Sequence, residues 1–249
     1  MLVSPSILSA DWTRLDQAVR LAEEGADWLH CDVMDGHFVP NLTFGAPMVE
    51  ALHRMTRLPL DVHLMIDDPL RWAPDYAKAG AHVLSVHVEA PGVCGHGWPR
   101  DAGGAHPIDL ARLHDTLDGL RALGVKAGLA LRPDTALDEV ESVLERIDVL
   151  LVMTVYPGFS GQSFLPGPLE TIRRAAAVRR ARGLSFLIEV DGGITVEDTG
   201  PQVAAAGVDV AVAGHGVYRR PDPVAAMRAL RALAPAAVAA PAAPGETRP

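Results

Sequence analysis

The sequence repeats one pattern eight times: a short apolar segment is followed by an amphipathic segment with helical spacing. Several of the apolar segments carry almost no polar residues, which is typical of parallel strands buried on both faces. Glycine ends four of the amphipathic segments directly before the next apolar segment, as expected at helix C-termini. Eight such units favour a single (β/α)8 barrel over a doubly wound sheet.

The expected elements follow from this alternation. We expect strands at Leu2–Leu8, Trp28–Met34, Leu60–Met65, Val83–Val88, Ala127–Leu131, Val149–Val155, Ser185–Val190 and Val208–Ala213. We expect helices at Asp11–Glu24, Ala46–Met55, Pro69–Ala79, Leu110–Leu123, Leu137–Arg146, Pro168–Arg182, Val196–Ala206 and Pro223–Leu233. The barrel is expected to span residues 1–233, with an extended loop at about residues 91–109. The Ala- and Pro-rich tail at residues 234–249 is expected to be disordered.

Composition narrows the class of partner. The net charge of −9, without a basic cluster beside stacking aromatic residues, argues against a nucleic-acid partner. The two cysteines do not form a C-x-x-C pair, and the sequence has no signal-peptide pattern. No apolar run reaches the roughly 18 residues of a membrane span. We therefore expect a cytoplasmic protein that acts on a small molecule and does not bind membranes.

Two of the expected strands carry polar and sulfur-containing side chains at every second position. These rows are His30, Asp32 and Met34 in one strand, and Asp61, His63 and Met65 in the next. Because residues two apart in a strand share one face, each row points into one space. Unpaired buried polar groups cost on the order of 2–7 kcal/mol, so these rows require partners or a function.

The functional groups of such a barrel lie at the C-terminal ends of its strands. There, His30, Asp32, His63 and Asp191 supply two imidazoles and two carboxylates, a donor set for one divalent metal ion. A single histidine would be an ordinary interior residue, but four such groups at one mouth favour a metal site. Zn²⁺ suits these donors best, while Fe²⁺, Mn²⁺ and Co²⁺ stay open.

Glycine-bearing loops follow the expected strands six, seven and eight. Barrels often bind phosphate at this position through backbone N–H groups, although the glycines alone would also permit tight turns. Met34, Met65 and Met153 stand at matching heights on three strands. They either fill the core or form an apolar surface over a charged intermediate.

Six segments carry a resemblance to a known family. They are SPSILSAD (Ser4–Asp11), HCDVMDGHFVPNLTFG (His30–Gly45), LDVHLM (Leu60–Met65), HVEA (His87–Ala90), MTVYPGFSGQSF (Met153–Phe164) and EVDGGI (Glu189–Ile194). Together they resemble ribulose-phosphate 3-epimerases, from about Val3 to Leu233. The resemblance implies a TIM barrel of the ribulose-phosphate-binding type. It also implies a homo-oligomer and the reversible inversion of C3 of D-ribulose 5-phosphate to D-xylulose 5-phosphate, in the pentose phosphate pathway.

The resemblance also implies a role for each site residue. Asp32 and Asp191 would be the acid and base groups, one for each face of C3. A divalent ion held by His30, Asp32, His63 and Asp191 would stabilise the enediolate, which Met34, Met65 and Met153 would cap. The substrate and its phosphate would contact Ser9, His63, Gly158, Phe159, Ser160, Gly161, Asp191, Gly192, Gly193, Gly214 and His215. Neutral histidine ligands also need a hydrogen-bond acceptor behind them, for which Asp61 and Ser85 are candidates.

Three features depart from the family pattern. His215 stands where serine is usual, and Ser160 stands where glycine is common, so that a turn needing positive φ would be strained. The loop at residues 91–109 is longer than usual. It would act as a lid, change the permitted substrate length, or pack against another subunit.

Three alternatives follow from these observations. A 3-epimerase for a ketohexose 6-phosphate, such as allulose 6-phosphate, fits the long loop and His215. A non-catalytic sugar-phosphate binding protein would not need the intact Asp32 and Asp191. Other barrel enzymes are unsupported: neither Lys78 nor Lys126 ends a strand, as a Schiff-base aldolase requires, and the D-x-K-x-x-D decarboxylase motif is absent.

Overall fold

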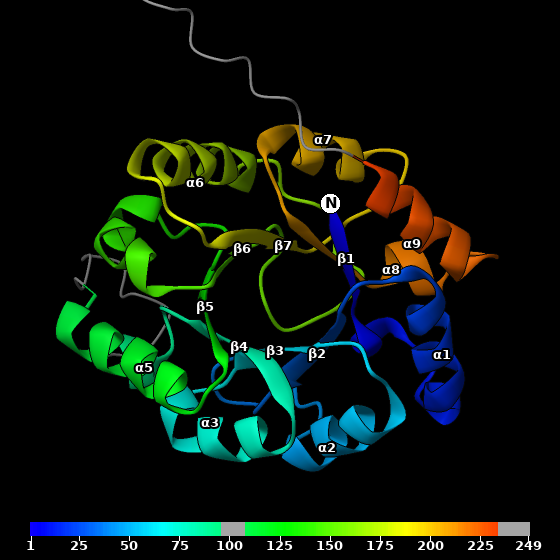
Figure 1. Cartoon of the computed structure of the whole chain (residues 1–249), viewed down its shortest axis with the longest axis horizontal. Helices are drawn as coiled ribbons and strands as arrows, with labels where there is room; N and C mark the ends of the chain where they lie inside the picture. Colours follow the sequence, from blue (N-terminus) through cyan, green and yellow to red (C-terminus); the bar gives the residue numbers. More distant parts are fainter. Residues whose placement is uncertain (96–107, 234–249) are drawn as a thin grey trace, which may run out of the picture.

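The chain folds into a barrel of eight parallel strands, as predicted (Figure 1). The computed structural model describes residues 1–95 and 108–233. The strands are β1 (Leu2–Pro5), β2 (Leu29–Met34), β3 (Leu60–Met65), β4 (Ala81–His87), β5 (Lys126–Leu131), β6 (Val149–Met153), β7 (Leu187–Asp191) and β8 (Val210–Ala213). Their order in the sheet is β1-β8-β7-β6-β5-β4-β3-β2.

The barrel closes between β1 and β2 with few contacts. The first and last strands of the sheet share one isolated parallel bridge, between Ser6 and His30. The Val3 carbonyl accepts two further hydrogen bonds, from the backbone N–H groups of Asp27 and Trp28. Other neighbouring strands share ladders of three to six residue pairs, so this seam is the most weakly connected part of the sheet.

Helices surround the strands as an outer ring (Figure 1). They are α1 (Leu15–Gly25), α2 (Ala46–Met55), α3 (Pro69–Lys78), α4 (Pro91–Cys94), α5 (Leu110–Ala122), α6 (Pro168–Arg182), α7 (Thr199–Ala206), α8 (His215–Tyr218) and α9 (Pro223–Ala232). Asp68, Asp109 and Asp222 cap α3, α5 and α9 by accepting a backbone N–H of the first turn. Among the described residues, no helix is long and apolar enough to cross a membrane.

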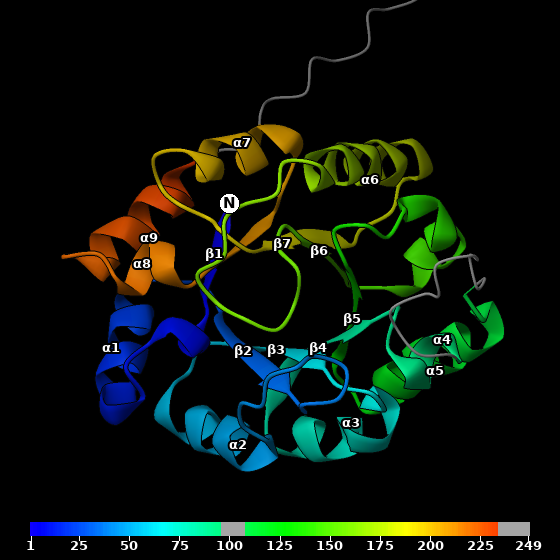
Figure 2. The same ribbon diagram turned by 180° about the vertical axis from the view of Figure 1, so that it is seen from behind.

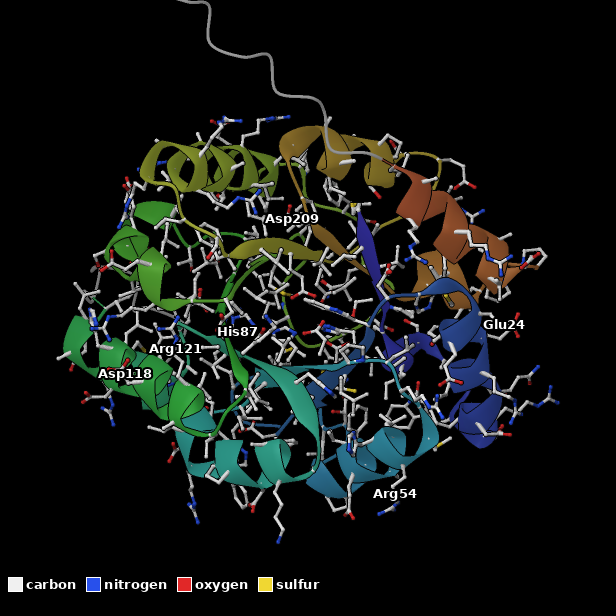
Figure 3. The ribbon with its side chains drawn as sticks, in the orientation of Figure 1. Glu24, Arg54, His87, Asp118, Arg121 and Asp209 are labelled. Carbon is white, nitrogen blue, oxygen red and sulfur yellow. The ribbon has the colours of Figure 1, made fainter. Side chains whose placement is uncertain are left out.

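The main apolar core lies between the sheet and this ring of helices. Strand residues such as Leu29, Val62 and Leu129 pack there against helix residues such as Leu52 and Leu117. Polar side chains of the strands point the other way, into the barrel. In Figure 3, His87 lies within the ring of strands, whereas Arg54 and Asp118 lie on the outer helices.

Several expected elements differ in type or extent. The segment expected to begin the first helix forms the 3-10 helix η2 (Trp12–Arg14), the strand expected to end at Val155 ends at Met153, and the helix expected from Val196 begins at Thr199. The segment Leu137–Arg146 forms two 3-10 helices, η3 (Leu137–Glu139) and η4 (Glu141–Arg146), instead of one α-helix. A 3-10 helix rises about 2.0 Å per residue against 1.5 Å, so this short connection between β5 and β6 still spans the length of the sheet. The first strand ends at Pro5, because Ser6 caps the 3-10 helix η1 (Ile7–Ser9).

The two irregular segments lie largely outside the described residues. Only the start of the long loop is described: Pro91–Cys94 forms the short helix α4, which ends at Gly95 with φ of 84°. The rest of that loop, residues 96–107, and the tail at residues 234–249 lie outside the described part of the chain. The extended loop and the disordered tail therefore stay predictions.

Candidate active site and metal centre

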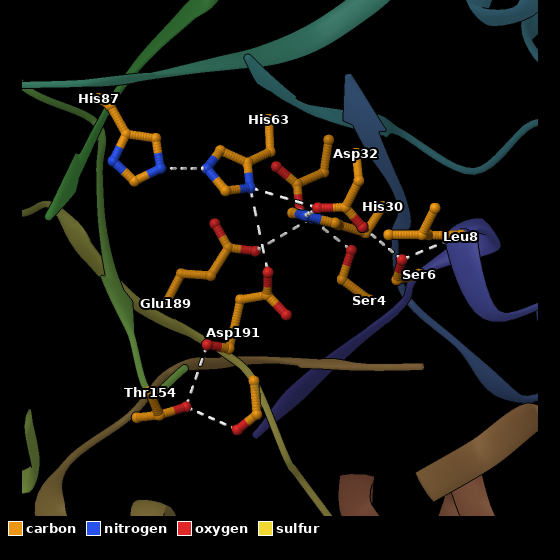
Figure 4. A network of polar contacts seen from close by, with 12 residues as sticks. Ser4, Ser6, Leu8, His30, Asp32, His63, His87, Thr154, Glu189 and Asp191 are labelled. Carbon is orange, nitrogen blue, oxygen red and sulfur yellow. Dashed lines mark hydrogen bonds and ion pairs between the residues drawn. The ribbon is translucent and has the colours of Figure 1, made fainter. Parts of the chain in front are cut away.

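Strand register brings the two predicted polar rows together inside the barrel. β2 and β3 pair so that His30 lies opposite Asp61, Asp32 opposite His63, and Met34 opposite Met65. All six side chains are buried. Asp191, the last residue of β7, approaches the same place (Figure 4).

The four predicted metal ligands meet at one point. One donor atom from each of His30, Asp32, His63 and Asp191 lies within 4.8 Å of all the others. Asp32 Oδ1 lies 3.4 Å from both His30 Nε2 and His63 Nδ1, and His63 Nδ1 lies 4.0 Å from Asp191 Oδ2. Ligands about 2.1 Å from a tetrahedral ion are about 3.4 Å apart, so this spacing fits one small divalent cation.

The imidazole of His30 is oriented for metal binding. Its Nδ1 lies 2.6 Å from Asp61 Oδ2, which also accepts from Ser4 Oγ at 3.1 Å. Its Nε2 is buried and has no hydrogen-bond partner among the described residues. Asp61 thus provides the expected acceptor, whereas the hydroxyl of Ser85 has no partner within the same residues.

The electrostatics of this cluster favour a positive charge at its centre. Burial lowers the pKa of His30, but the charges of Asp61 and Asp32 outweigh burial and raise this pKa well above its ordinary value. The buried carboxylates thus favour a positive charge on the Nε2 side of this imidazole. A divalent cation at that position supplies the same kind of charge.

The two candidate acid–base groups have different proton affinities. Burial and the charge of Asp32 raise the pKa of Asp191 to about 7. Burial also acts to raise the pKa of Asp32, but His30 and His63 outweigh it and bring this pKa below its ordinary range. Two carboxylates whose pKa values are pushed apart are suited to opposite proton-transfer roles.

Two neighbours hold the residues that carry these carboxylates. Ser6 Oγ donates to Asp32 Oδ2 at 2.5 Å, across the seam of the barrel. Thr154 Oγ1 donates to the backbone carbonyls of Asp191 and Gly192, at 3.0 and 2.6 Å, and so fixes the end of β7 (Figure 4). Sequence reasoning did not assign a role to either neighbour, although both lie within the motifs that carry the resemblance.

Sequence reasoning also missed three buried groups behind the metal ligands. His87 Nε2 lies 2.9 Å from His63 Nε2, and its Nδ1 lies 2.9 Å from Glu89 Oε2. The available signal was the same two-residue alternation, which places Ser85, His87 and Glu89 in a third polar row. Glu189 lies beside Asp61, and burial and that charge raise its pKa well above the ordinary value.

A cavity of about 580 Å³ opens above the four ligands. Figure 2 shows the loop that follows β6 lying across the centre of this end of the barrel. Most of the residues expected to contact substrate or intermediate line the cavity: Ser9, Asp32, Met34, Met65, Met153, Gly158, Phe159, Ser160, Gly161, Asp191, Gly192, Gly193, Gly214 and His215. His63 is not among the lining residues; its Nδ1 lies 3.4 Å from Asp32 Oδ1, on the neighbouring strand. Thr195, Asp198 and Gln202 also line the cavity and were not expected.

Glycine conformation shapes the loops around this cavity. Gly192 has φ of +124°, and a Cβ there would lie 2.6 Å from Val155 Cγ2. Gly158 and Gly161 take the positive φ values of the preceding loop. The expectation of strain at Ser160 was wrong, because within residues 1–95 and 108–233 only glycines have positive φ.

His215, the residue that departs from the family pattern, lies inside the cavity. It begins α8, directly after Gly214 and the end of β8. Its Nδ1 lies 3.1 Å from Ser9 Oγ, and its ring lies beside Gly161, where a Cβ would come within 3.1 Å of it. The imidazole therefore joins the loops that follow β6 and β8 to the segment after β1.

Comparisons with known proteins agree with this geometry. A family model, "Ribulose-phosphate 3 epimerase family", matches residues 2–96 and 104–218. The ribulose-phosphate 3-epimerase of Mycobacterium tuberculosis (strain H37Rv) is 48% identical over 229 residues, which cover 92% of this chain and 90% of that protein. The ribulose-phosphate 3-epimerase of Bacillus subtilis is 45% identical over 227 residues, covering 90% of this chain and 95% of that protein.

Solved structures support the fold alone. The crystal structure of KGPDC from Streptococcus mutans in complex with D-R5P aligns with a TM-score of 0.63 at 15% identity, covering 92% of this chain and 95% of that one. The family is assigned on two grounds. The two epimerases are 45–48% identical to this chain, and they and the family model match it over most of its length. The chain therefore belongs to the ribulose-phosphate 3-epimerase family and is an enzyme of that family.

Proposed function

We propose that this chain interconverts D-ribulose 5-phosphate and D-xylulose 5-phosphate by inverting C3, with one divalent metal ion as cofactor. One observation carries the proposal: Asp32 and Asp191 line the same cavity, and both lie against His30 and His63. The two aspartates come from β2 and β7, which β1 and β8 separate in the sheet. They therefore approach a bound substrate from different directions, as an inversion requires.

The protein's own groups divide the work of the reaction. One aspartate removes the C3 proton and the other delivers a proton to the opposite face of the planar intermediate. When bound, a divalent ion supplies positive charge that stabilises the enediolate oxygens, and the mixed imidazole and carboxylate donors favour Zn²⁺. Met34, Met65 and Met153 present an apolar surface that excludes water from the intermediate.

The loops around the cavity are suited to hold the phosphate. Glycine-bearing segments after β6, β7 and β8 line the cavity and carry backbone N–H groups. Such groups bind phosphate without a lysine or arginine side chain. The side chains of Ser9 and His215, which contact each other, add polar atoms to the same wall.

Solvent exchange tests the reaction directly. The metal-loaded protein is incubated with D-ribulose 5-phosphate in D₂O, and deuterium at C3 is followed by NMR. We expect incorporation together with D-xylulose 5-phosphate. Absence of deuterium at C3 would contradict the proposal and favour a binding protein. Turnover of pentulose and hexulose phosphates side by side tests the substrate, for which the ketohexose alternative stays a prediction.

The variant Asp191→Asn tests the assignment of the acid–base pair. We expect exchange to fall by about 10²- to 10⁴-fold, the usual contribution of a general acid or base. Asp118→Asn, on the outer helix α5, is the matched control because it removes the same charge far from the cavity (Figure 3). Near-native exchange by a folded Asp191→Asn protein would remove this residue from its proposed role.

A further inference from the structure

A line of three buried side chains leads away from the metal ligands. His63 faces the ligand cluster with Nδ1, and its Nε2 lies 2.9 Å from His87 Nε2. His87 Nδ1 in turn lies 2.9 Å from Glu89 Oε2. His63 and His87, whose contact is drawn in Figure 4, are fully buried, and Glu89 is 2% exposed, so water does not replace these contacts.

The surroundings of Glu89 fix which of its atoms accept. Oε1 accepts hydrogen bonds from the backbone N–H of Arg132, at 2.9 Å, and from Thr135 Oγ1. Burial acts to raise the pKa of Glu89, but hydrogen bonds from His87, Thr135 and Arg132 outweigh burial and lower it. Glu89 is therefore a carboxylate, and a carboxylate can only accept hydrogen bonds.

This carboxylate determines the proton positions on both imidazoles. A neutral imidazole has one N–H donor and one acceptor nitrogen. Because Glu89 Oε2 accepts, the hydrogen of His87 lies on Nδ1 and its Nε2 becomes an acceptor. His63 must then donate from Nε2, where the contact is 2.9 Å, rather than from Nδ1, whose contact with Asp32 Oδ1 is 3.4 Å and longer than an ordinary hydrogen bond. This leaves a lone pair on Nδ1, the atom that faces Asp32 and Asp191.

We propose that His87 and Glu89 are positioning residues that hold His63 in the tautomer whose Nδ1 binds the metal ion. The inference deepens the proposed metal site and rests on it. The other proposed histidine ligand, His30, is oriented differently, because the carboxylate of Asp61 contacts its imidazole directly. Glu89 contacts His87 but not His63. It therefore acts on His63 by setting which nitrogen of His87 carries the hydrogen, and not by direct contact.

The variant Glu89→Gln reverses this arrangement. The N–H of Arg132 and the hydroxyl of Thr135 hold the amide oxygen at the position of Oε1, so the NH₂ group faces His87 Nδ1. His87 must then donate from Nε2, and His63 Nε2 must accept. The hydrogen of His63 moves to Nδ1 and blocks the metal-binding lone pair.

Two measurements test the proposal without relying on activity. Imidazole ¹⁵N NMR of the metal-free wild-type chain is expected to place hydrogen on Nε2 of His63 and Nδ1 of His87. In Glu89→Gln both positions are expected to reverse. Zn²⁺ affinity, measured by competition with a chromogenic chelator, is expected to fall by about 10- to 100-fold. The wild-type measurement needs no variant, so the opposite tautomers there would overturn the proposal even where Glu89→Gln fails to fold.

Thr135→Val is the matched control. It removes the other side-chain hydrogen bond to Glu89 but leaves a carboxylate facing His87. We expect wild-type tautomers and Zn²⁺ affinity within about twofold of wild type. Equal losses of affinity in Thr135→Val and Glu89→Gln, with unchanged tautomers, would show a structural role and overturn the proposal. A wild-type chain that binds no Zn²⁺ would instead contradict the proposed metal site.

Discussion

The two halves of the site are built in different ways. The base consists of strand side chains: His30, Asp32, His63 and Asp191, with Asp61, His87 and Glu89 behind them. The rim consists of the loops after β6, β7 and β8, which contribute Gly158–Gly161, Gly192-Gly193 and Gly214-His215. The base depends on the chemical identity of each side chain, whereas the rim depends on backbone conformation. Changes in the base should therefore affect chemistry, and changes in the rim should affect affinity.

Removing the metal ion is expected to reduce turnover more than any other change. It alters the base of the site and leaves the loops of the rim unchanged. We expect a chelator to reduce turnover by more than about 10³-fold, because enediolate stabilisation is lost. A ligand at 100 times its Kd adds about 2.7 kcal/mol of stability, so the melting temperature should fall by roughly 5–10 °C. Calorimetry and activity before and after chelation measure both effects. Full activity in the chelator would refute the metal requirement.

Gly192→Ala is expected to have an intermediate effect, through the rim. An alanine at φ of +124° is strained, and its Cβ would press against Val155. A cost of about 1–3 kcal/mol corresponds to a fall of about 5- to 150-fold in kcat/KM, expected largely in KM. Gly167→Ala is the control, since its φ is −53° and a Cβ there meets no atom within 4 Å. Loss of bound Zn²⁺ in Gly192→Ala would show that rim and base are not separable.

His215→Ser is expected to have the smallest effect. It removes the contact with Ser9 Oγ but leaves the backbone donors of the rim in place. The loss of one hydrogen bond of about 1 kcal/mol predicts a rise in KM of about fivefold with kcat unchanged. Steady-state kinetics measure this change. A lower kcat at constant KM would place His215 with the base instead.

The sequence predicted the fold and the cluster of His and Asp side chains because both leave periodic signals. Alternation with period two placed His30 and Asp32 on one interior face, and the next strand repeated the pattern with His63. Glycines at helix ends separated the repeating units. The segment Leu137–Arg146 was assigned the wrong helix type, because its apolar spacing does not reveal how far so short a connection must reach.

The contacts behind the ligands could not be predicted in the same way. His87 shares its face with Ser85, but which of them reaches His63 depends on the register of β3 against β4 and on ring orientation. Neither is encoded by the spacing of polar residues along one strand. Likewise, the spacing of glycines did not reveal that Gly158 and Gly161, and not Ser160, take the positive φ values.

The sparse closure between β1 and β2 would link binding of the proposed metal ion to the stability of the whole barrel. Ser6 on one side of that seam bonds Asp32 on the other, and its backbone partner across the seam is His30. A cation bound by His30, Asp32, His63 and Asp191 would also join this seam to β3 and β7. Binding of the ion would therefore make local opening at the seam less favourable, and we expect the metal-free protein to open first between β1 and β2.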